Sequence, residues 1–589
     1  MATATGEPAA QEGASAPGNR RRRAAKALSP RRLWASPRIL LIRQLPRASR
    51  PLTALAAVSL AIGAALPTAQ MLVAGTLVGR VPAALKAGGL DTPAGRSLLH
   101  ALAAVAGLYL FQFAAVPLLN LGTQALGRRV DRDLSQRVMA SVLAPTGIGH
   151  LEDPTTLDDV NKAEGLVTGR TPGGAVTAMI AVWAQRLAAI GGAIVLTRFS
   201  PLVAVTVVGA ALFERRFWRR RYEQVTASLF NRGDLHRRTS YLRDTTLTPI
   251  AAKEVRVFGA QAWLQRRFHS AWVEVMAPVW QDMKGRPRDQ FTYAVLPTAI
   301  TLGSLYWIGS SAIEGRIGLA AAVVYAQAVF TANALANAGD QDETIAAGVA
   351  ALPVALDLER RLQPDAVGGI DPVAMPKASI RFEGVHFTYP GRENDIYAGL
   401  DLDIPAGRSL AVVGDNGAGK TTLVKLLARL YEPTAGRITV DGVDLRQLDP
   451  AKWQTRIAAI FQDFRKYHLP ARDNVAFGAP HIAGDAAALE RAARRTGADT
   501  IVDGLADGWD TPLDRQLTGG TDLSGGQWQR IALARAMFAV EGGAGVLVLD
   551  EPTASLDVRT EAEIYDRFLE LTTGLTTIVI SHRFSTVRR

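Results

Sequence analysis

The sequence predicts an α-helical membrane bundle joined to a soluble α/β domain, and three observations carry this prediction. Long uncharged runs recur through roughly the first 340 of the 589 residues. A glycine-rich loop, GDNGAGKTT, starts at Gly414 between an apolar strand and a helix-forming segment. A further apolar strand ends in two carboxylates, Asp550 and Glu551. Because a chain of this length is too long for one core, two or more domains are expected.

Composition and charge restrict the class of protein. The chain is 48% apolar and has a net charge of +12, and eleven Lys and Arg residues lie within the first fifty positions. Most other basic residues flank apolar runs, which favours juxtamembrane placement over nucleic-acid binding. The chain has no cysteine, which excludes disulfides, thiolate metal sites and a cysteine nucleophile. Residues 1–32 are predicted to form a basic disordered tail, not a signal peptide.

Six uncharged or nearly uncharged runs are long enough, or nearly so, to be membrane-spanning helices. They are Pro51–Gly79, Ser97–Gly127, Thr171–Thr197, Phe199–Phe213, Phe291–Ile313 and Ile317–Gly339. The fourth run is short and is expected to continue into its basic flank. We therefore expect a transmembrane domain at 33–345, a linker at 346–377 and a soluble domain at 378–589.

Loop charges predict the orientation of these spans. The longer connections, 128–170 and 214–289, are much richer in Lys and Arg than the short ones, and positive residues remain cytoplasmic. The sequence thus predicts a multi-pass protein of the cell membrane with its N-terminus and soluble domain in the cytoplasm. Loops this long are expected to continue as helices below the bilayer. Arg186, the ionisable residue inside the third run, either marks a substrate pathway or lies near an interface.

The glycine-rich loop has the spacing of a phosphate-binding P-loop. Gly414 is followed after four residues by Gly419, Lys420 and Thr421, with the strand 410–413 before and a helix after. Backbone N–H groups of such a loop point at phosphate, the lysine reaches the terminal phosphates, and the threonine hydroxyl suits Mg²⁺. A chance glycine turn is a poor alternative in this strand–loop–helix context.

Two further strands bring acid–base groups to the same sheet edge. Asp550, at the end of strand 546–549, suits a Mg²⁺-holding role, and Glu551 can polarise an attacking water. His582 follows strand 577–580 at the carboxyl edge of a presumed parallel sheet, where it could contact the terminal phosphate.

In order along the chain, these motifs resemble the ATPase of ABC transporters. They are Walker A, Gln462 in AIFQDF, LSGGQ at 523–527, Walker B at 546–551, ASLD with Asp557, and His582. FTYP resembles the family's adenine-stacking element. The resemblance implies ATP and Mg²⁺ as cofactors, with Glu551, His582 and Gln462 as catalytic residues and Thr421, Gln462 and Asp550 holding the metal. The implied nucleotide-binding residues are Tyr389, Gly414, Asp415, Asn416, Gly417, Ala418, Gly419, Lys420, Thr421, Thr422, Ser524, Gly525, Gly526, Gln527 and Asp557.

Together with the six runs, the resemblance extends to exporter-type half-transporters. The segments LEDPTTLDDVNKA and AAKEVRVFGA resemble the family's coupling loops. In that family LSGGQ caps ATP bound to a second subunit, so the implied partners are a second chain, the lipid bilayer and a transported molecule, with no nucleic acid. Intact catalytic positions suffice for a homodimer, although the intact half of a heterodimer also fits. Because the chain stops seven residues after His582, the sequence suggests a shortened C-terminus.

ATP-driven export is the function that this resemblance implies, and the substrate is open. DRQLTGGTDLSGG and Trp528 resemble exporters of ribosomal peptides such as lantibiotics, whereas a drug-like or lipid substrate also fits. A siderophore importer with exporter architecture and an ATP-binding membrane sensor are alternatives. A soluble ABC ATPase acting on DNA or ribosomes is disfavoured by the six runs.

Overall fold

The computed structural model describes residues 36–589 apart from 166–168, 231–232, 250, 285–286, 338, 365–367, 416, 552–571, 573 and 582–589. The chain divides into two compact units, one of residues 1–138 with 158–358 and one of 139–157 with 359–589. The units are described separately below.

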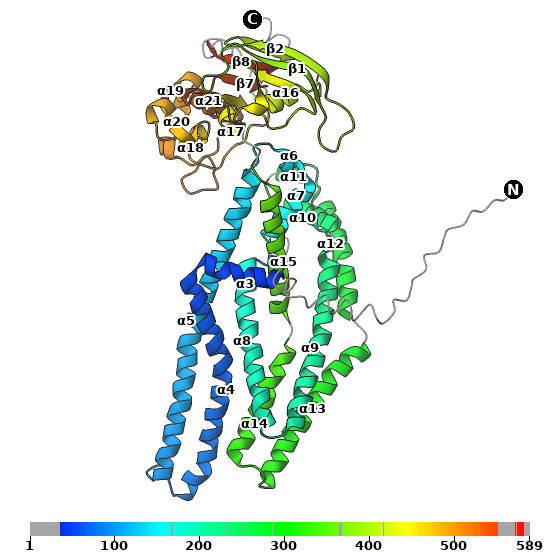
Figure 1. The fold of residues 1–589 in the computed structure, drawn as a ribbon, viewed down its shortest axis with the longest axis vertical. Helices are drawn as coiled ribbons and strands as arrows, with labels where there is room; N and C mark the ends of the chain where they lie inside the picture. The colour runs from blue at the N-terminus through cyan, green and yellow to red at the C-terminus, as the bar shows by residue number, and fades with distance from the viewer. Residues whose placement is uncertain are drawn as a thin grey trace, which may run out of the picture. The chain divides into compact units, whose positions relative to one another are not determined.

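All regular structure in the described residues of the first unit is helical (Figure 1). Its helices are α3 (Pro37–Ala48), α4 (Arg50–Lys86), α5 (Pro93–Leu143), α7 (Pro154–Ala163), α8 (Pro172–Thr197), α9 (Pro201–Phe230), α10 (Gly233–Leu247), α11 (Ala252–Val257), α12 (Gln261–Lys284), α13 (Pro287–Ile313), α14 (Leu319–Asn333), the 3₁₀ turn η1 (Ala334–Ala336) and α15 (Asp340–Arg361). Helices α5, α7 and α15 continue past the boundary of the unit.

Five helices among the described residues are long and apolar enough to cross a membrane. They correspond to five of the six runs expected from the sequence: α4, α5, α8, α13 over 291–313, and the helical stretch 319–361, which includes α14, η1 and α15. The expected fourth run lies in α9, which is a continuous helix that extends into the basic flank, as expected, but is not among the five. Its apolar stretch, 201–213, is shorter than a membrane-spanning segment before the charged residues Glu214, Arg215 and Arg216 begin.

Close helix contacts in this unit depend on residues without side-chain bulk. Helices α4, α8 and α14 pack on one another, around a core that includes Met71, Leu196 and Val329. Where α5 meets α8, a Cβ added to Gly173 would lie 2.1 Å from the carbonyl oxygen of Gly127. Only glycine permits this approach, because backbone atoms cannot yield as a flexible side chain can.

The second unit contains two four-stranded sheets. β2 (Tyr397–Pro405), β1 (Ser379–Phe387), β4 (Ala435–Val440) and β5 (Val443–Asp444) form an antiparallel sheet in that order. β3 (Ser409–Val413), β8 (Thr576–Ser581), β7 (Val546–Asp550) and β6 (Ile457–Ile460) form a parallel sheet in that order. The three strands expected from the sequence are therefore neighbours in the parallel sheet, and their carboxyl ends meet at one edge.

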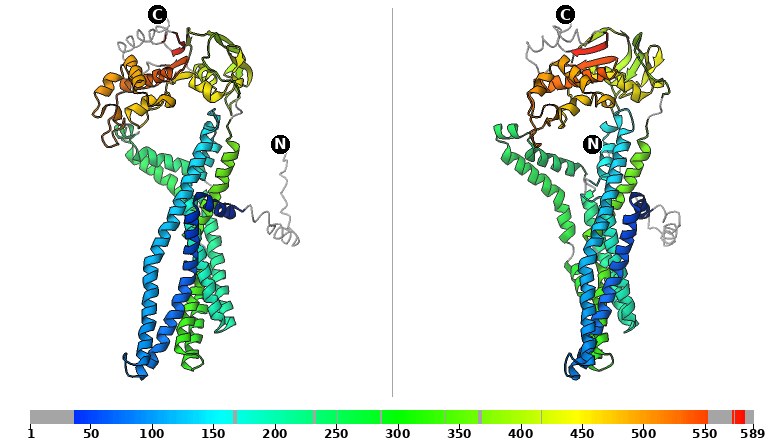
Figure 2. Two further views of the ribbon diagram at one scale, coloured as in Figure 1. Left: turned by 60° about the vertical axis from the view of Figure 1, so that its left-hand side comes forward. Right: turned by 90° about the vertical axis from the view of Figure 1, so that its left-hand side faces the viewer.

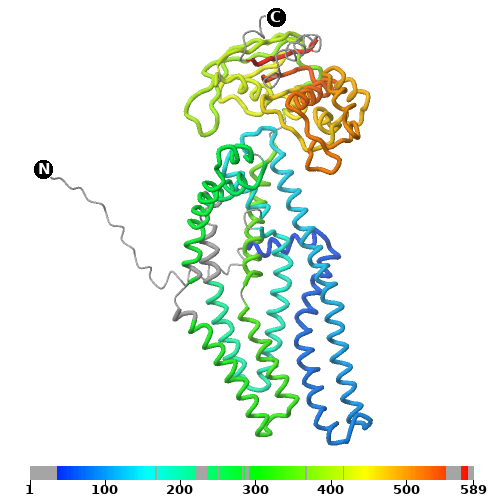
Figure 3. Tube along the Cα trace, turned by 180° about the vertical axis from the view of Figure 1, so that it is seen from behind, coloured from blue at the N-terminus to red at the C-terminus, as the bar shows by residue number. Residues whose placement is uncertain are grey.

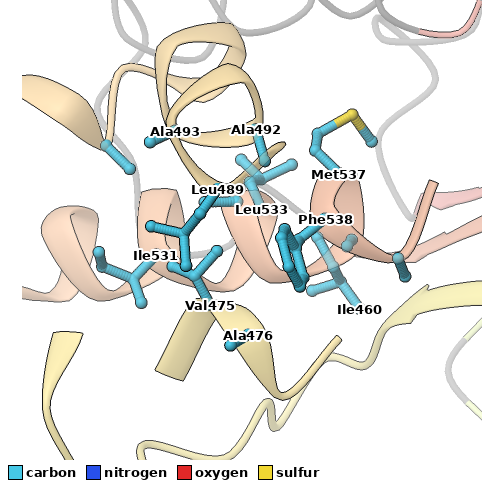
Figure 4. Packing of buried hydrophobic residues seen from close by; sticks show 14 of the residues in the cluster. Ile460, Val475, Ala476, Leu489, Ala492, Ala493, Ile531, Leu533, Met537 and Phe538 are labelled. Atoms are coloured by element: carbon cyan, nitrogen blue, oxygen red, sulfur yellow. The ribbon is translucent and has the colours of Figure 1, made fainter. Parts of the chain in front are cut away.

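Helices surround the sheets of this unit. They are α6 (Gly149–Glu152), α16 (Lys420–Leu427), η2 (Leu445–Gln447), α17 (Pro450–Thr455), α18 (Ala471–Ala476), η3 (Pro480–Ile482), α19 (Ala486–Thr496), α20 (Asp499–Asp503), η4 (Gly508–Asp510) and α21 (Gly525–Glu541). Figure 4 shows Leu533, Met537 and Phe538 of α21 packed with Leu489 of α19 and Val475 of α18. This apolar contact holds α21, and therefore the LSGGQ motif at its start, in a fixed position within the unit.

Segment 139–157 comes from the helical half of the sequence but packs with the second unit. The Ile148 N–H donates to the Leu430 carbonyl at 3.0 Å, and the Gln454 amide donates to the Thr146 carbonyl at 3.1 Å. Hydrogen bonds from Thr155 and Thr156 lower the pKa of Asp153, which precedes α7, to about 2. The expected domain limits differ from this division in two ways. The expected transmembrane domain, 33–345, includes 139–157, which belongs to the second unit. The linker expected at 346–377 begins inside α15, whose buried face includes Leu352 and Leu358.

Candidate nucleotide-binding site

The P-loop connects β3 to α16 through residues with positive φ angles. Gly417 and Gly419 have φ near +90°, in the region that only glycine occupies readily. A Cβ on Gly419 would lie 2.8 Å from Cγ2 of Ile396. The Tyr397 hydroxyl donates to the Gly419 carbonyl at 2.7 Å and fixes the end of the loop. The loop therefore requires glycine both for its backbone angles and for its close packing.

Lys420 is the first residue of α16, and its ammonium group turns back over the loop. Its Nζ donates to the carbonyls of Gly414 at 2.7 Å and of Asp415 at 2.9 Å. These bonds hold the positive charge beside the helix N-terminus, where backbone N–H groups and the helix dipole also favour an anion.

Thr421 and Asp550 meet across the sheet edge. The Thr421 hydroxyl donates to Oδ2 of Asp550 at 2.7 Å, and Asp550 is only 2% exposed. Burial raises the pKa of the Asp550 carboxyl, whereas the Thr421 hydrogen bond and the nearby Lys420 charge oppose this rise. A hydroxyl and a carboxylate held together beside a phosphate loop are hard oxygen ligands of the kind that Mg²⁺ prefers.

Glu551 has an unusual backbone conformation. Its φ is +50°, which is uncommon for a residue with a side chain, and its N–H donates to the Ile580 carbonyl at 3.0 Å. The Gln462 amide donates to Oε2 of Glu551 at 2.8 Å. Such backbone strain persists only where the surroundings enforce it and often accompanies functional sites.

An aromatic cluster forms the far end of the site. The Tyr389 hydroxyl lies 3.1 Å from Oγ1 of Thr422, and its ring is edge-on to Tyr431 at 5.3 Å between centroids. Lys425 and Arg392 lie over the Tyr389 ring, at 5.3 and 5.8 Å from its centroid. A base stacked on Tyr389 would therefore lie beside two cations and the end of the phosphate loop.

These groups enclose one cavity of about 600 Å³. Its lining includes nine residues expected from the sequence: Tyr389, Gly417, Gly419, Lys420, Thr421, Thr422, Gln462, Asp550 and Glu551. It also includes Arg392 and Ile396, which sequence reasoning did not identify. Arg392 lies three residues after Tyr389 in YPGR. This short separation in sequence is the feature from which its place in the site could have been predicted. Ile396, which immediately precedes β2, packs against the loop, and no sequence motif indicated this contact.

The LSGGQ residues form a separate feature. Ser524 caps α21 by accepting from the Gln527 N–H at 3.3 Å, and the Ser524 N–H donates to the Gln527 side chain at 2.8 Å. This reciprocal capping box fixes the start of the helix. Ser524, Gly525, Gly526 and Gln527 are all described, and none of them lines the cavity of its own chain.

Several expected site residues lie outside the described part of the chain, namely Asn416, Asp557 and His582. Gly414, Asp415 and Ala418 belong to the loop but not to the cavity lining.

Arg186, in the first unit, forms an ion pair. Its guanidinium donates to Asp342, at the start of α15, at 2.7 Å. Asp342 also lies 3.5 Å from Arg215, so this carboxylate pairs with arginines of two helices.

Sequence comparisons match these features to one family. Residues 397–554 match the family model described as ABC transporter. The chain is 34% identical over 339 residues to an ATP-dependent lipid A-core flippase of Chromohalobacter salexigens, covering 57% of this chain and 56% of that protein. It is 36% identical over 212 residues to a subtilin transport ATP-binding protein of Bacillus subtilis, covering 36% of this chain and 34% of that protein. The matched stretch thus spans little more than half of the flippase and less of the subtilin protein.

A comparison of structures extends the likeness to nearly the whole chain. A bacterial Atm1-family ABC exporter with ATP bound aligns with a TM-score of 0.67 and 22% identity, covering 90% of this chain and 91% of the other. This match includes both the helical unit and the nucleotide-binding unit. The chain therefore shares the fold of that protein.

Proposed function

Because this chain joins an ABC transporter domain to a helical membrane bundle with the ABC-exporter fold, we propose that it is an ATP-driven exporter subunit that acts as a pair. The observation that carries the proposal is the single cavity in which the phosphate loop, Asp550, Gln462 and Glu551 converge. Hydrolysis of ATP there would supply the free energy for transport.

The residues present have separate roles in this proposal. Lys420 and the loop N–H groups bind the phosphates, and Tyr389 stacks on the base. Glu551 polarises the attacking water, and Gln462, hydrogen-bonded to it, orients its carboxylate. Thr421, Asp550 and Gln462 would hold Mg²⁺, which neutralises charge on the phosphates when bound. Asn416 would join the phosphate loop, and Asp557 and His582 would complete the site from the following segments.

A second copy would complete each site. Ser524–Gln527 start a helix whose N–H groups suit a γ-phosphate, yet they do not line the cavity of their own chain. ATP held between the P-loop of one copy and LSGGQ of the other would favour the closed pair, because it binds that state better. Hydrolysis then removes the bridging phosphate. We infer a homodimer with its N-terminus and ATPase domains in the cytoplasm.

The proposal includes a peptide as the substrate to be tested first. The support is the similarity to a subtilin transport protein and the LSGGQ surroundings, whereas the flippase similarity favours a lipid. Inside-out vesicles with ATP outside separate the possibilities. ATP-dependent accumulation of a peptide, drug-like compound or lipid identifies export and its substrate class, and ATP-dependent loss of a preloaded siderophore would instead identify import.

Glu551→Gln tests the catalytic assignment. The variant retains the hydrogen-bonding shape of the side chain but loses the base, so ATP turnover should fall by about 100-fold or more while ATP remains bound. Phosphate release and retained radiolabelled ATP measure the two effects. Glu490→Gln is the matched control, because Glu490 pairs with Arg494 on the surface. Normal hydrolysis by Glu551→Gln would refute the assignment of the base.

A further inference from the structure

A cavity separate from the nucleotide site lies inside the first unit, where α4, α5 and α8 meet. Helices α4 and α5 run side by side, as Figures 2 and 3 show. The cavity has a volume of about 180 Å³, which is roughly the space that six water molecules occupy in the liquid. It is therefore large enough for a small organic molecule but not for a whole peptide or lipid.

Contacts between α4 and α5 flank this cavity along the helix axes. On one side, the Gln70 amide of α4 donates to the side-chain oxygen of Gln112 on α5. On the other side, a Cβ added to Gly122 of α5 would lie 2.2 Å from Cδ2 of Leu55 on α4. The two helices are thus held together at both places, and the space between these contacts is left unfilled.

A proline changes the hydrogen bonding in the wall of the cavity. Pro67 lies inside α4, and it has no N–H to donate to the carbonyl four residues earlier, which belongs to Gly63. Gly63 lines the cavity. A helix that crosses a membrane needs another donor for such a carbonyl, because lipid offers none. The cavity is the place from which that donor can come.

The side chains around the cavity are neutral. Ser59 of α4 and Asn120 of α5 add a hydroxyl and a carboxamide, whereas the Thr123 and Thr177 hydroxyls donate to carbonyls of their own helices. All the lining residues are described, and none of them is ionisable. A charged ligand would lose its hydration here without gaining a counter-charge. The rest of the lining is largely apolar and includes Ile62, Val116, Leu119 and Ile180.

We propose that this cavity binds a small neutral amide with a short aliphatic chain. The amide N–H donates to the Gly63 carbonyl, the amide oxygen accepts from Ser59 or Asn120, and the aliphatic chain contacts the apolar side chains. An amide suits the site because one small group supplies both a donor and an acceptor. The inference goes beyond the proposed function, since it rests on the membrane placement of the helices and not on ATP turnover or the direction of transport.

Two ligands of equal size test the hydrogen bond to Gly63. Butyramide carries the proposed amide, and methyl propyl ketone has a methyl group in place of the amino group and therefore no donor. Saturation-transfer NMR on the full-length protein in nanodiscs measures both dissociation constants, with empty nanodiscs as the blank for partition into lipid. We expect butyramide to bind about tenfold more tightly than the ketone, because the ketone leaves a buried acceptor unpaired. Butyrate, which is charged, should bind more weakly than butyramide by about tenfold or more.

Variants separate this contact from a general effect on the helices. Pro67→Ala restores the N–H that pairs with the Gly63 carbonyl, so it should weaken butyramide binding by about tenfold and leave ketone binding unchanged. Pro82→Ala is the matched control, because Pro82 also lies inside α4 but does not line the cavity. Ala181→Leu fills the cavity and should abolish binding of both ligands. Ala106→Leu, at an exposed position on α5, should leave binding unchanged.

Several results would overturn the proposal. Equal affinity of the unaltered protein for butyramide and the ketone, or an undiminished preference for butyramide in Pro67→Ala, would refute the amide as the ligand. Butyramide binding that persists in Ala181→Leu would refute the cavity as its site. ATP hydrolysis in the same nanodiscs tests the proposed function separately, because loss of turnover with unchanged butyramide binding concerns the nucleotide site alone.

Discussion

At Asp550, burial disfavours the charged carboxylate that binding of a cation would require. Its carboxylate is 2% exposed and accepts a hydrogen bond from Thr421. Burial raises its pKa, so the folded chain resists the charge that a cation would require. A protein retains such a group where function outweighs the loss of stability.

Asp550→Asn should therefore stabilise the nucleotide-free protein and impair Mg²⁺-dependent ATP binding. An acid whose folded pKa exceeds its unfolded value, about 3.9, costs stability as pH rises above that value. The variant lacks this cost, so its melting temperature should exceed that of the wild type by a few degrees at pH 7 and by less as pH falls towards 4. Thermal unfolding from pH 4 to 8 measures the difference. A lower melting temperature at pH 7 would contradict this account.

Residues of the site could be predicted from the sequence where their chemistry is local. The spacing from Gly414 to Thr421 fixes a phosphate loop, and the apolar strand before Asp550 fixes its place at a sheet edge. Arg392 and Ile396 reach the cavity only through tertiary packing, which short-range spacing does not report. The partner of Arg186 was unpredictable for the same reason, since Asp342 lies 156 residues away.

At the scale of elements, the contact between α5 and α8 depends on two facing glycines. The backbone of each lies where a side chain of the other would be. The hydrogen bonds from Thr171 and Gly173 to Asp131 fix the start of α8 at the same crossing. The length of the uncharged runs predicted both helices, but it could not predict where they cross.

Gly173→Ala should separate these helices. The new Cβ would lie 2.1 Å from the Gly127 carbonyl oxygen, and relieving that overlap should cost about 1–3 kcal/mol. The melting temperature in detergent should fall by several degrees. Gly107→Ala on α5 is the control, because a Cβ there meets nothing within 4 Å and alanine is the better helix former. Equal melting temperatures for the two variants would show that the crossing is not tight.

For the whole molecule, the arrangement of LSGGQ makes one copy catalytically incomplete in our proposal. Nanodiscs that hold a single copy should hydrolyse ATP about 100-fold more slowly than discs that hold two, because the γ-phosphate lacks the second set of donors. Steady-state ATPase measurements on discs sorted by copy number provide the comparison. Full, non-cooperative activity in single-copy discs would reject the paired mechanism.

Segment 139–157 has a consequence for engineering this architecture. The polypeptide passes between the two units at 138/139, at 157/158 and again at 358/359. A catalytic domain produced by cutting at residue 359 would lose the loop that bonds to Leu430 and Gln454. Chimeras that exchange this unit between chains of the same fold must therefore carry two separate stretches of sequence, because a graft of 359–589 alone would meet a loop 139–157 from a different chain.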